Sequence, residues 1–275
     1  MCDVAPLHTA IHSCVDMRIG KGWAKGRSAA DDPRIARAGN AHRGLIYRPR
    51  RTASPGIGWS PRSAYAVGLI ATDGCLIRDG RHIAFVTQDE ELMKTFLACI
   101  DHTEQRYRKE RTRIGNDLFR IQLSDANLYR WLIGVGLTPR KSLSLGAIDV
   151  PAELFAHTVR GLLDGDGSVY VARHRPTLRK YPNYWYVRLR TLFTSASHEH
   201  VKWLRAQILC TYGLYGAVQR VCRAERHDMF RLVYEKRESL VLLNALYADA
   251  SAPCLQRKKA VWLGYLARNG AEGGT

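Results

Sequence analysis

Two stretches decide the fold of this chain: AVGLIATDG at residues 66–74 and VRGLLDGDG at residues 159–167. When aligned, they share two glycines, a leucine and an aspartate at one constant interval, 161 − 68 = 93 residues. The matching pairs are Gly68 and Gly161, Leu69 and Leu162, Asp73 and Asp166, and Gly74 and Gly167. A repeat this long predicts two duplicated domains rather than a solenoid, whose units run to about 20–50 residues.

The same order of elements is predicted after each copy of the repeat. In the first half we expect a short strand after Gly74, a strand over 81–87, a helix over 88–100, strands over 107–113 and 118–123, and a helix over 124–136. In the second half we expect a hairpin over 168–195, a helix over 198–213, a strand pair near 215–235 and a helix over 238–247. The predicted fold class is α+β, with two pseudo-symmetric αββαββα units.

Each repeat motif is predicted to lie on a helix, here called a motif helix. Ser60 followed by Pro61 is a typical helix start, and residues 149–151, Asp-Val-Pro, predict a similar start for the second motif helix. Gly74 and Gly167 are predicted to end the two helices in the left-handed conformation. An aspartate then falls in the last turn of each helix, where the dipole disfavours a carboxylate by up to about 1 kcal/mol. We infer that a cation lies close by.

Gly68 and Gly161 lie in the middle of these helices, where glycine costs about 1 kcal/mol relative to alanine. Such a residue is best explained by the close approach of another backbone. The motif helices are therefore expected to pack against each other at these glycines. That contact would bring Asp73 and Asp166 together as a site for a hard divalent cation such as Mg²⁺.

The motif pair resembles that of the LAGLIDADG homing endonucleases, in the monomeric form with two motifs in one chain, over about residues 60–266. The resemblance implies motif helices at a pseudo-twofold interface and two antiparallel sheets that form a saddle over DNA. It also implies a Mg²⁺-dependent endonuclease that hydrolyses both strands of a long, asymmetric target site and leaves short 3′ overhangs. Such enzymes are products of mobile introns.

The resemblance also assigns roles to individual residues. Asp73 and Asp166 match the metal-binding catalytic acids of the family. Gln88 matches a polar residue that organises water near the metals, and Ser197 is read as its counterpart in the second half, so the two halves are expected to differ chemically. The basic residues that steady the phosphate charge match Lys141 in the first half and Lys258 or Lys259 in the second. Ala71 replaces the aspartate found at position 164, a position that is not a metal ligand.

The net charge indicates a polyanionic partner, because 42 Lys and Arg against 25 Asp and Glu give +17. The strand before Ser195 alternates, with Tyr184, Tyr186, Arg188 and Arg190 on one face and Trp185, Val187, Leu189 and Thr191 on the other. The first face is predicted to read a DNA groove, where arginine pairs with guanine, and the second to lie under helices. The predicted DNA contacts in the hairpin over 168–195 are Arg173, Arg175, Arg179, Lys180, Tyr186, Arg188 and Arg190. Weaker candidates from the other strands are Arg78, Arg81, Arg111, Arg113, Arg120, Gln122, Arg220, Arg223 and Arg231.

Composition supplies the remaining expectations. We predict a basic N-terminal arm over 1–59, repeats over 60–148 and 149–268, and a disordered tail over 269–275. The seven cysteines form no CxxC pair, and no apolar run is long enough to span a membrane or to act as a secretory signal. An intracellular monomer is expected. The residues 198–200, His-Glu-His, are read as an exposed helix start rather than a metal site.

Two other functions on the same fold stay open. One is an intron RNA maturase, which intact acids do not exclude and which preferential binding of intron RNA over duplex DNA would identify. The other is a DNA-binding regulator that does not cleave. Regulators of that kind add a C-terminal helical domain, for which we expect no room after Gly167.

Overall fold

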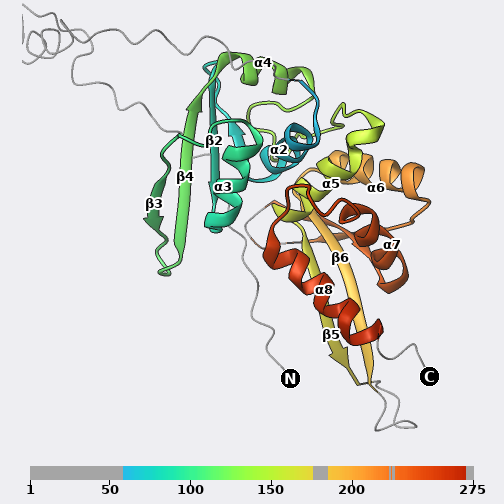
Figure 1. The fold of residues 1–275 in the computed structure, drawn as a ribbon. Coiled ribbons are helices and arrows are strands. Elements are labelled where there is room, and N and C mark those ends of the chain that lie inside the picture. The colour runs from blue at the N-terminus through green and yellow to red at the C-terminus, as the bar shows by residue number, and fades with distance from the viewer. Residues whose placement is uncertain (1–57, 176–184, 223, 225–226, 271–275) are drawn as a thin grey trace, which may run out of the picture. The chain divides into compact units, whose positions relative to one another are not determined.

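The computed structural model describes residues 58–175, 185–222, 224 and 227–270, all within one compact unit, Ser54–Thr275. These residues form seven α-helices and two antiparallel sheets of four strands each (Figure 1). The α+β class and the two αββαββα units are confirmed. The predicted arm over 1–59 lies outside the described residues up to residue 57, and the predicted tail lies outside them from residue 271.

The first half follows the predicted order closely. Its elements are α2 (Pro61–Asp73), β1 (Gly74–Leu76), β2 (His82–Thr87), α3 (Glu90–Cys99), β3 (Arg108–Arg111), β4 (Asp117–Ser124) and α4 (Ala126–Gly134). Along β4, Phe119, Ile121 and Leu123 are buried as their alternation predicts. They cover the side of the sheet that faces the helices.

The second half repeats this order and adds a helix. Its elements are a 3₁₀ turn η1 (Ala152–Leu154), α5 (Phe155–Asp164), β5 (Ser168–His174), β6 (Tyr186–Ser195), α6 (His198–Tyr212), β7 (Ala217–Val221), β8 (Met229–Tyr234), α7 (Lys236–Leu246) and α8 (Gln256–Gly270). The sequence did not predict α8. Its buried positions, Lys258, Trp262 and Tyr265, follow a helical period, but the lysine obscures the apolar pattern.

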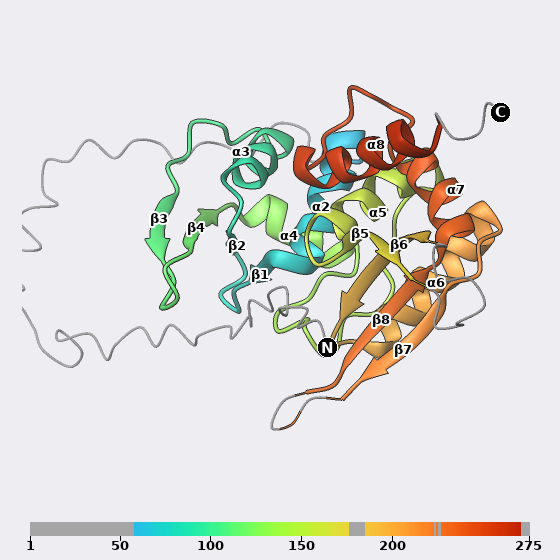
Figure 2. The same cartoon turned by 90° about the horizontal axis from the view of Figure 1, so that it is seen from below.

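The two sheets have the same topology. The first has the strand order β1-β2-β4-β3 and the second β5-β6-β8-β7, with every neighbouring pair antiparallel. Figure 2 shows the second sheet from its β7 and β8 side. The equal strand orders confirm a structural duplication, as the 93-residue interval predicts.

The two motif helices begin differently, which corrects one prediction. At Ser60 the side chain and that of Ser63 form a reciprocal capping box, with Pro61 as the first helical residue, as expected. The second helix begins through η1, and Asp149 is not its cap, since no side-chain cap bond is formed at Leu154 or Pro151. Pro151, with φ −56° and ψ 139°, precedes this 3₁₀ turn, which leads directly into α5.

The prediction of left-handed glycines at the helix ends is wrong. Gly74 is extended, with φ −90° and ψ 160°, and Gly167 is not among the glycines of positive φ. Glycine is required for a different reason: a Cβ on Gly74 would lie 2.7 Å from Ile70 Cα, and one on Gly167 would lie 2.7 Å from Leu163 Cα. After each motif helix the backbone turns back sharply over the helix it has just left, and at these two glycines there is no room for a side chain.

The glycine contact between the motif helices is confirmed. A Cβ on Gly68 would lie 2.8 Å from the Leu162 nitrogen and closer still to the Thr158 carbonyl oxygen. A Cβ on Gly161 would lie 3.0 Å from Gly68 Cα and closer still to the Tyr65 carbonyl oxygen. The backbones of α2 and α5 therefore touch, and the two helices lie side by side in both views (Figures 1 and 2).

No helix among the described residues combines the length and the apolar character that crossing a bilayer requires.

Candidate active site

The glycine contact brings the C-terminal ends of the two motif helices together. Asp73 is the last residue of α2, whereas Asp166 lies in the turn after α5, which ends at Asp164. The expectation that Asp166 belongs to the last helical turn is therefore wrong. The two turns are in contact, because a Cβ on Gly165 would overlap the Thr72 side chain. Both Asp73 and Asp166 act electrostatically on the ammonium group of Lys258.

Two buried lysines hold these turns in matching ways. Lys141 Nζ donates to the carbonyl oxygens of Gly74 at 2.7 Å and of Thr72 at 3.4 Å. Lys258 Nζ donates to the equivalent carbonyl oxygens, Gly167 at 2.7 Å and Gly165 at 3.2 Å. Lys258 is 7% exposed, while Lys259 is only half-buried. Of the two candidates in the second half, Lys258 is thus the structural counterpart of Lys141.

Lys258 also makes contacts that the resemblance does not imply. Its Nζ also donates to the carbonyl oxygens of Leu163 at 2.7 Å and Asp164 at 2.8 Å, so four carbonyls share three N–H donors. Burial lowers the pKa of Lys258 to about 8, against the opposing effect of Asp164 and, more weakly, of Asp73 and Asp166. In this arrangement Lys258 neutralises the negative end of α5 and fixes the turn that carries Asp166.

Lys258 should therefore matter for stability. We expect Lys258→Met to lower the free energy of unfolding by about 3 kcal/mol or more, because several buried carbonyls lose their donor. Lys259→Met, one position along the helix, should change it by less than about 0.5 kcal/mol. Urea unfolding followed by circular dichroism measures both, and equal effects of the two substitutions would refute the assignment.

A buried carboxylate that the sequence interpretation passed over joins the motif helices to α8. Asp164 Oδ2 accepts hydrogen bonds from Tyr65 Oη at 2.8 Å and from the backbone nitrogen of Leu255 at 2.7 Å. Asp164 is 2% exposed, and burial raises its pKa to about 6. Its signal was present in the sequence as the difference between Ala71 and Asp164. Asp164 orients the start of α8, and with it Lys258, in the second half only.

The structure corrects the alignment of Gln88 in the first half with Ser197 in the second. Asp89 N donates to Thr87 Oγ1 and Ser197 N donates to Ser195 Oγ, both at 3.1 Å. These residues cap α3 and α6 at equivalent places, so the counterpart of Gln88 is Ala196 and not Ser197. The Ser197 hydroxyl is buried and donates to the Leu145 carbonyl oxygen at 2.5 Å. The chemical difference between the two halves is thus larger than predicted.

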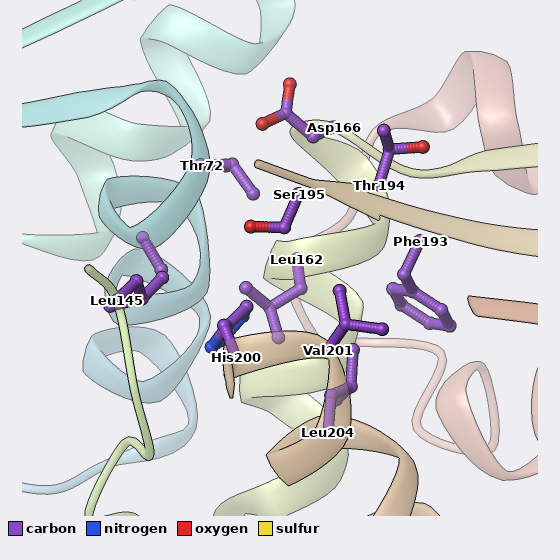
Figure 3. Close-up of a pocket in the computed structure, with 11 residues that line it drawn as sticks. Thr72, Leu145, Leu162, Asp166, Phe193, Thr194, Ser195, His200, Val201 and Leu204 are labelled. Atoms are coloured by element: carbon purple, nitrogen blue, oxygen red, sulfur yellow. The ribbon is translucent and has the colours of Figure 1, made fainter. Parts of the chain in front are cut away.

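A cavity of about 20 Å³, enough for one water molecule, lies beside Asp166. Figure 3 shows Thr72 and Ser195 at this cavity, with the Asp166 carboxylate at its outer end. His200 lines the opposite part and its Nδ1 lies 2.9 Å from the Gly146 carbonyl oxygen. His200 is only 4% exposed, so the prediction that residues 198–200 are an exposed helix start is wrong for this residue.

His200 should make the fold sensitive to acid. Burial lowers its pKa from 6.5 to about 4, so the folded chain binds this proton less readily than the unfolded chain does. The resulting stability is present above about pH 6.5 and is lost as the pH falls through 4, with a total of about 3 kcal/mol. His200→Gln should flatten the stability profile over this window in urea unfolding at each pH. An unchanged slope would contradict the assignment.

Across the described ranges no group of three or more His, Cys, Asp or Glu side chains is gathered for a metal. A divalent cation at the ends of the motif helices would have the carboxylates of Asp73 and Asp166 as its side-chain ligands. Magnesium in phosphoryl chemistry is commonly held by one or two carboxylates, with water and substrate phosphates as the other ligands. A magnesium ion in phosphoryl transfer is commonly held by few protein ligands, and the phosphate of the substrate completes its coordination.

The predicted DNA contacts divide between the two faces of the sheets. Those on the open faces are Arg120, Gln122, Tyr186, Arg188, Arg190 and Arg231. Arg173 and Arg220 instead lie on the face that carries the buried Leu189 and Leu232, so their predicted place on the open face is wrong. Exposed or half-buried on strands or turns are Arg78, Arg81, Arg120, Gln122, Arg173, Arg175, Tyr186, Arg188, Arg190, Arg220 and Arg231. Arg179, Lys180, Tyr184 and Arg223 lie outside the described residues. The alternation of β6 is confirmed, with Leu189 and Thr191 buried, but Trp185 is 48% exposed and lies under the Arg175 guanidinium instead of under a helix.

Comparison with known proteins identifies the fold. A solved structure of the LAGLIDADG homing endonuclease I-LtrWI bound to target DNA matches with a TM-score of 0.50 and 11% identity, over 78% of this chain and 91% of that chain. The N-terminal LAGLIDADG domain of DUF199/WhiA matches with a TM-score of 0.46 and 16% identity, over 68% and 82%. A structure of I-DmoI in complex with DNA and Ca matches with a TM-score of 0.46 and 16% identity, over 73% and 96%. A scan of protein-family models and a search of curated proteins find no match.

Proposed function

We propose that this chain, which has the LAGLIDADG fold, is a site-specific endonuclease that hydrolyses both strands of duplex DNA with a divalent cation. One observation carries the proposal. Gly68 and Gly161 hold the motif helices in backbone contact, and Asp73 at the end of α2 and Asp166 just after α5 both act electrostatically on Lys258. Two carboxylates at a pseudo-symmetric interface suit a reaction that acts on two phosphodiesters.

The residues of the chain divide the work as follows. Asp73 and Asp166 would hold Mg²⁺, which supplies an activated water and stabilises charge on a phosphate oxygen. Lys141 and Lys258 position the two turns through their carbonyls. Gln88, half-buried after β2, orients water in the first half. Its counterpart in the second half, Ala196, has no polar side-chain group for this role. Cleavage would leave short 3′ overhangs.

The DNA-reading surface supports a long and asymmetric target. The first sheet presents Arg120 and Gln122 from β4, and the second presents Arg188 and Arg190 from β6. Because the two open faces differ in sequence, they would read different half-sites. One chain contains both motifs, so a monomer suffices, and we expect such an enzyme to act inside the cell as the product of a mobile intron.

The test exposes a randomised library of duplex DNA to the full chain and recovers the sequence that is cleaved. We expect cuts at a defined sequence in Mg²⁺, with 3′ overhangs mapped by sequencing of the ends, and none in excess EDTA. Binding of duplex DNA without cleavage in Mg²⁺ or Mn²⁺ would identify a regulator instead. Preferential binding of intron RNA without cleavage would identify a maturase.

A further inference from the structure

The second sheet contains an arginine pair that shares a single carboxylate. Arg188 and Arg190 lie on the open face of β6, and Glu235 follows β8, the strand paired with β6. Thr191 is paired with Tyr234. One position along, Arg190 and Glu235 therefore lie opposite each other on the other, open face of the sheet. On the other side, Arg190 is paired with Tyr170 of β5. Arg190 is thus flanked across the sheet by Tyr170 on β5 and by Glu235 after β8.

Glu235 binds Arg190 in a two-pronged arrangement. Arg190 Nε donates to Glu235 Oε2 at 3.0 Å, and Arg190 Nη2 donates to Glu235 Oε1. Arg188 Nε donates to the same Oε2 at 3.3 Å. The carboxylate therefore occupies the side edge of the Arg190 guanidinium, which Nε and Nη2 form. The end edge, which Nη1 and Nη2 form, points away from it.

That end edge is a bidentate donor, the geometry with which arginine binds O6 and N7 of guanine in the major groove. A free arginine on a strand loses rotamer entropy when it adopts this geometry, and it can turn to a phosphate instead. A guanidinium already fixed by a carboxylate loses less entropy and is directed at one place. Fixed donors therefore favour base recognition over phosphate contact.

The first sheet offers a contrast. Glu110 lies 3.8 Å from Arg120 Nε, an ion pair without a hydrogen bond. This carboxylate reduces the local positive charge but does not set the direction of the guanidinium. Comparing substitutions of Glu110 and of Glu235 therefore separates the effect of a lost negative charge from the effect of a lost guanidinium orientation.

We propose that Glu235 is a specificity-determining positioning residue, which directs the Arg190 guanidinium at one guanine of the target. The inference rests on the proposed function, since it requires a DNA target read by the second sheet. Glu235 would itself touch no base, and it would discriminate against the other bases through Arg190.

The experiment selects a randomised duplex DNA library by binding to the full chain in Ca²⁺ and reads base preferences by sequencing. Arg190→Ala should remove a guanine preference at one position. Glu235→Gln and Glu235→Asp should lower that preference about tenfold or more at the same position, because one loses the charge and the other the reach for a two-pronged contact. Glu110→Gln, which also removes one negative charge, should leave the preference unchanged.

The outcomes are distinct. Glu235 is exposed and makes no capping bond to α7, so its variants should fold, as circular dichroism will confirm. If Glu235→Gln and Glu235→Asp keep the guanine preference, or only raise affinity for every sequence equally, the inference is overturned while the proposed function stands. If the wild-type chain enriches no sequence at all, the proposed function fails and the inference fails with it.

Discussion

Replacing both motif aspartates, Asp73→Asn together with Asp166→Asn, should lower the rate of DNA cleavage by at least about a thousandfold while DNA binding persists. Asparagine keeps the size of the side chain but removes the negative charge that a divalent cation requires. The open faces of the sheets, which carry the arginines, are left intact. Cleavage of a selected target in Mg²⁺ and its retention on a filter in Ca²⁺ measure the two effects separately.

A matched control is Asp101→Asn. Asp101 is exposed after α3, and its carboxylate pairs with Arg62 at the start of α2, the end opposite to Asp73. This substitution removes the same charge and should leave cleavage unchanged. Equal activity of the wild-type chain and the double variant would exclude the two aspartates from the reaction.

Gly161→Ala should have the largest effect on stability, with a loss of about 3 kcal/mol or more in the free energy of unfolding. The added methyl group would overlap the Tyr65 carbonyl and Gly68 Cα, both of them backbone, so no side-chain rotation can make room. The motif helices would have to move apart, and Tyr65 would lose its hydrogen bond to Asp164. With Gly68→Ala added, we expect no folded protein, because small domains have only about 5–15 kcal/mol in total.

Gly264→Ala is the control for helix propensity. Gly264 lies in the middle of α8, and a Cβ there would meet only the Arg268 side chain, at 3.8 Å. Alanine should stabilise this helix by up to about 1 kcal/mol. Thermal and urea unfolding of the wild-type, Gly161→Ala and Gly264→Ala proteins measures the change in the free energy of unfolding. A Gly161→Ala variant as stable as wild type would show that the backbones do not meet at this position.

The sequence predicts those features that depend on local pattern or on the repeat itself. The alternation in β4 and β6, the Ser60 cap and the two matching sheets follow from periodicity and turn chemistry. The contact between Gly68 and Gly161 also follows, because a glycine at the same place in both motif helices is best explained by the close approach of another backbone. The carbonyl contacts of Lys141 and Lys258 do not follow from the resemblance.

The features that were missed depend on contacts between distant residues. Gly74 and Gly167 are glycines because the chain returns over Ile70 and Leu163, which no turn statistic distinguishes from a left-handed cap. Asp164 binds Tyr65 across 99 positions of sequence. The link from Arg190 to Glu235 depends on the pairing of β6 with β8, which only the folded sheet determines.

The position of a bound cation tests the central claim most directly, and it requires no knowledge of the DNA target. Mn²⁺ takes the same oxygen ligands as Mg²⁺ and broadens the NMR signals of nearby amides. During a Mn²⁺ titration of the full chain, we predict that the amides of residues 72–74 and 165–167 broaden together and before others, and that excess Mg²⁺ restores them. Broadening of one turn alone, or first at amides remote from both, would contradict a site that the two aspartates share.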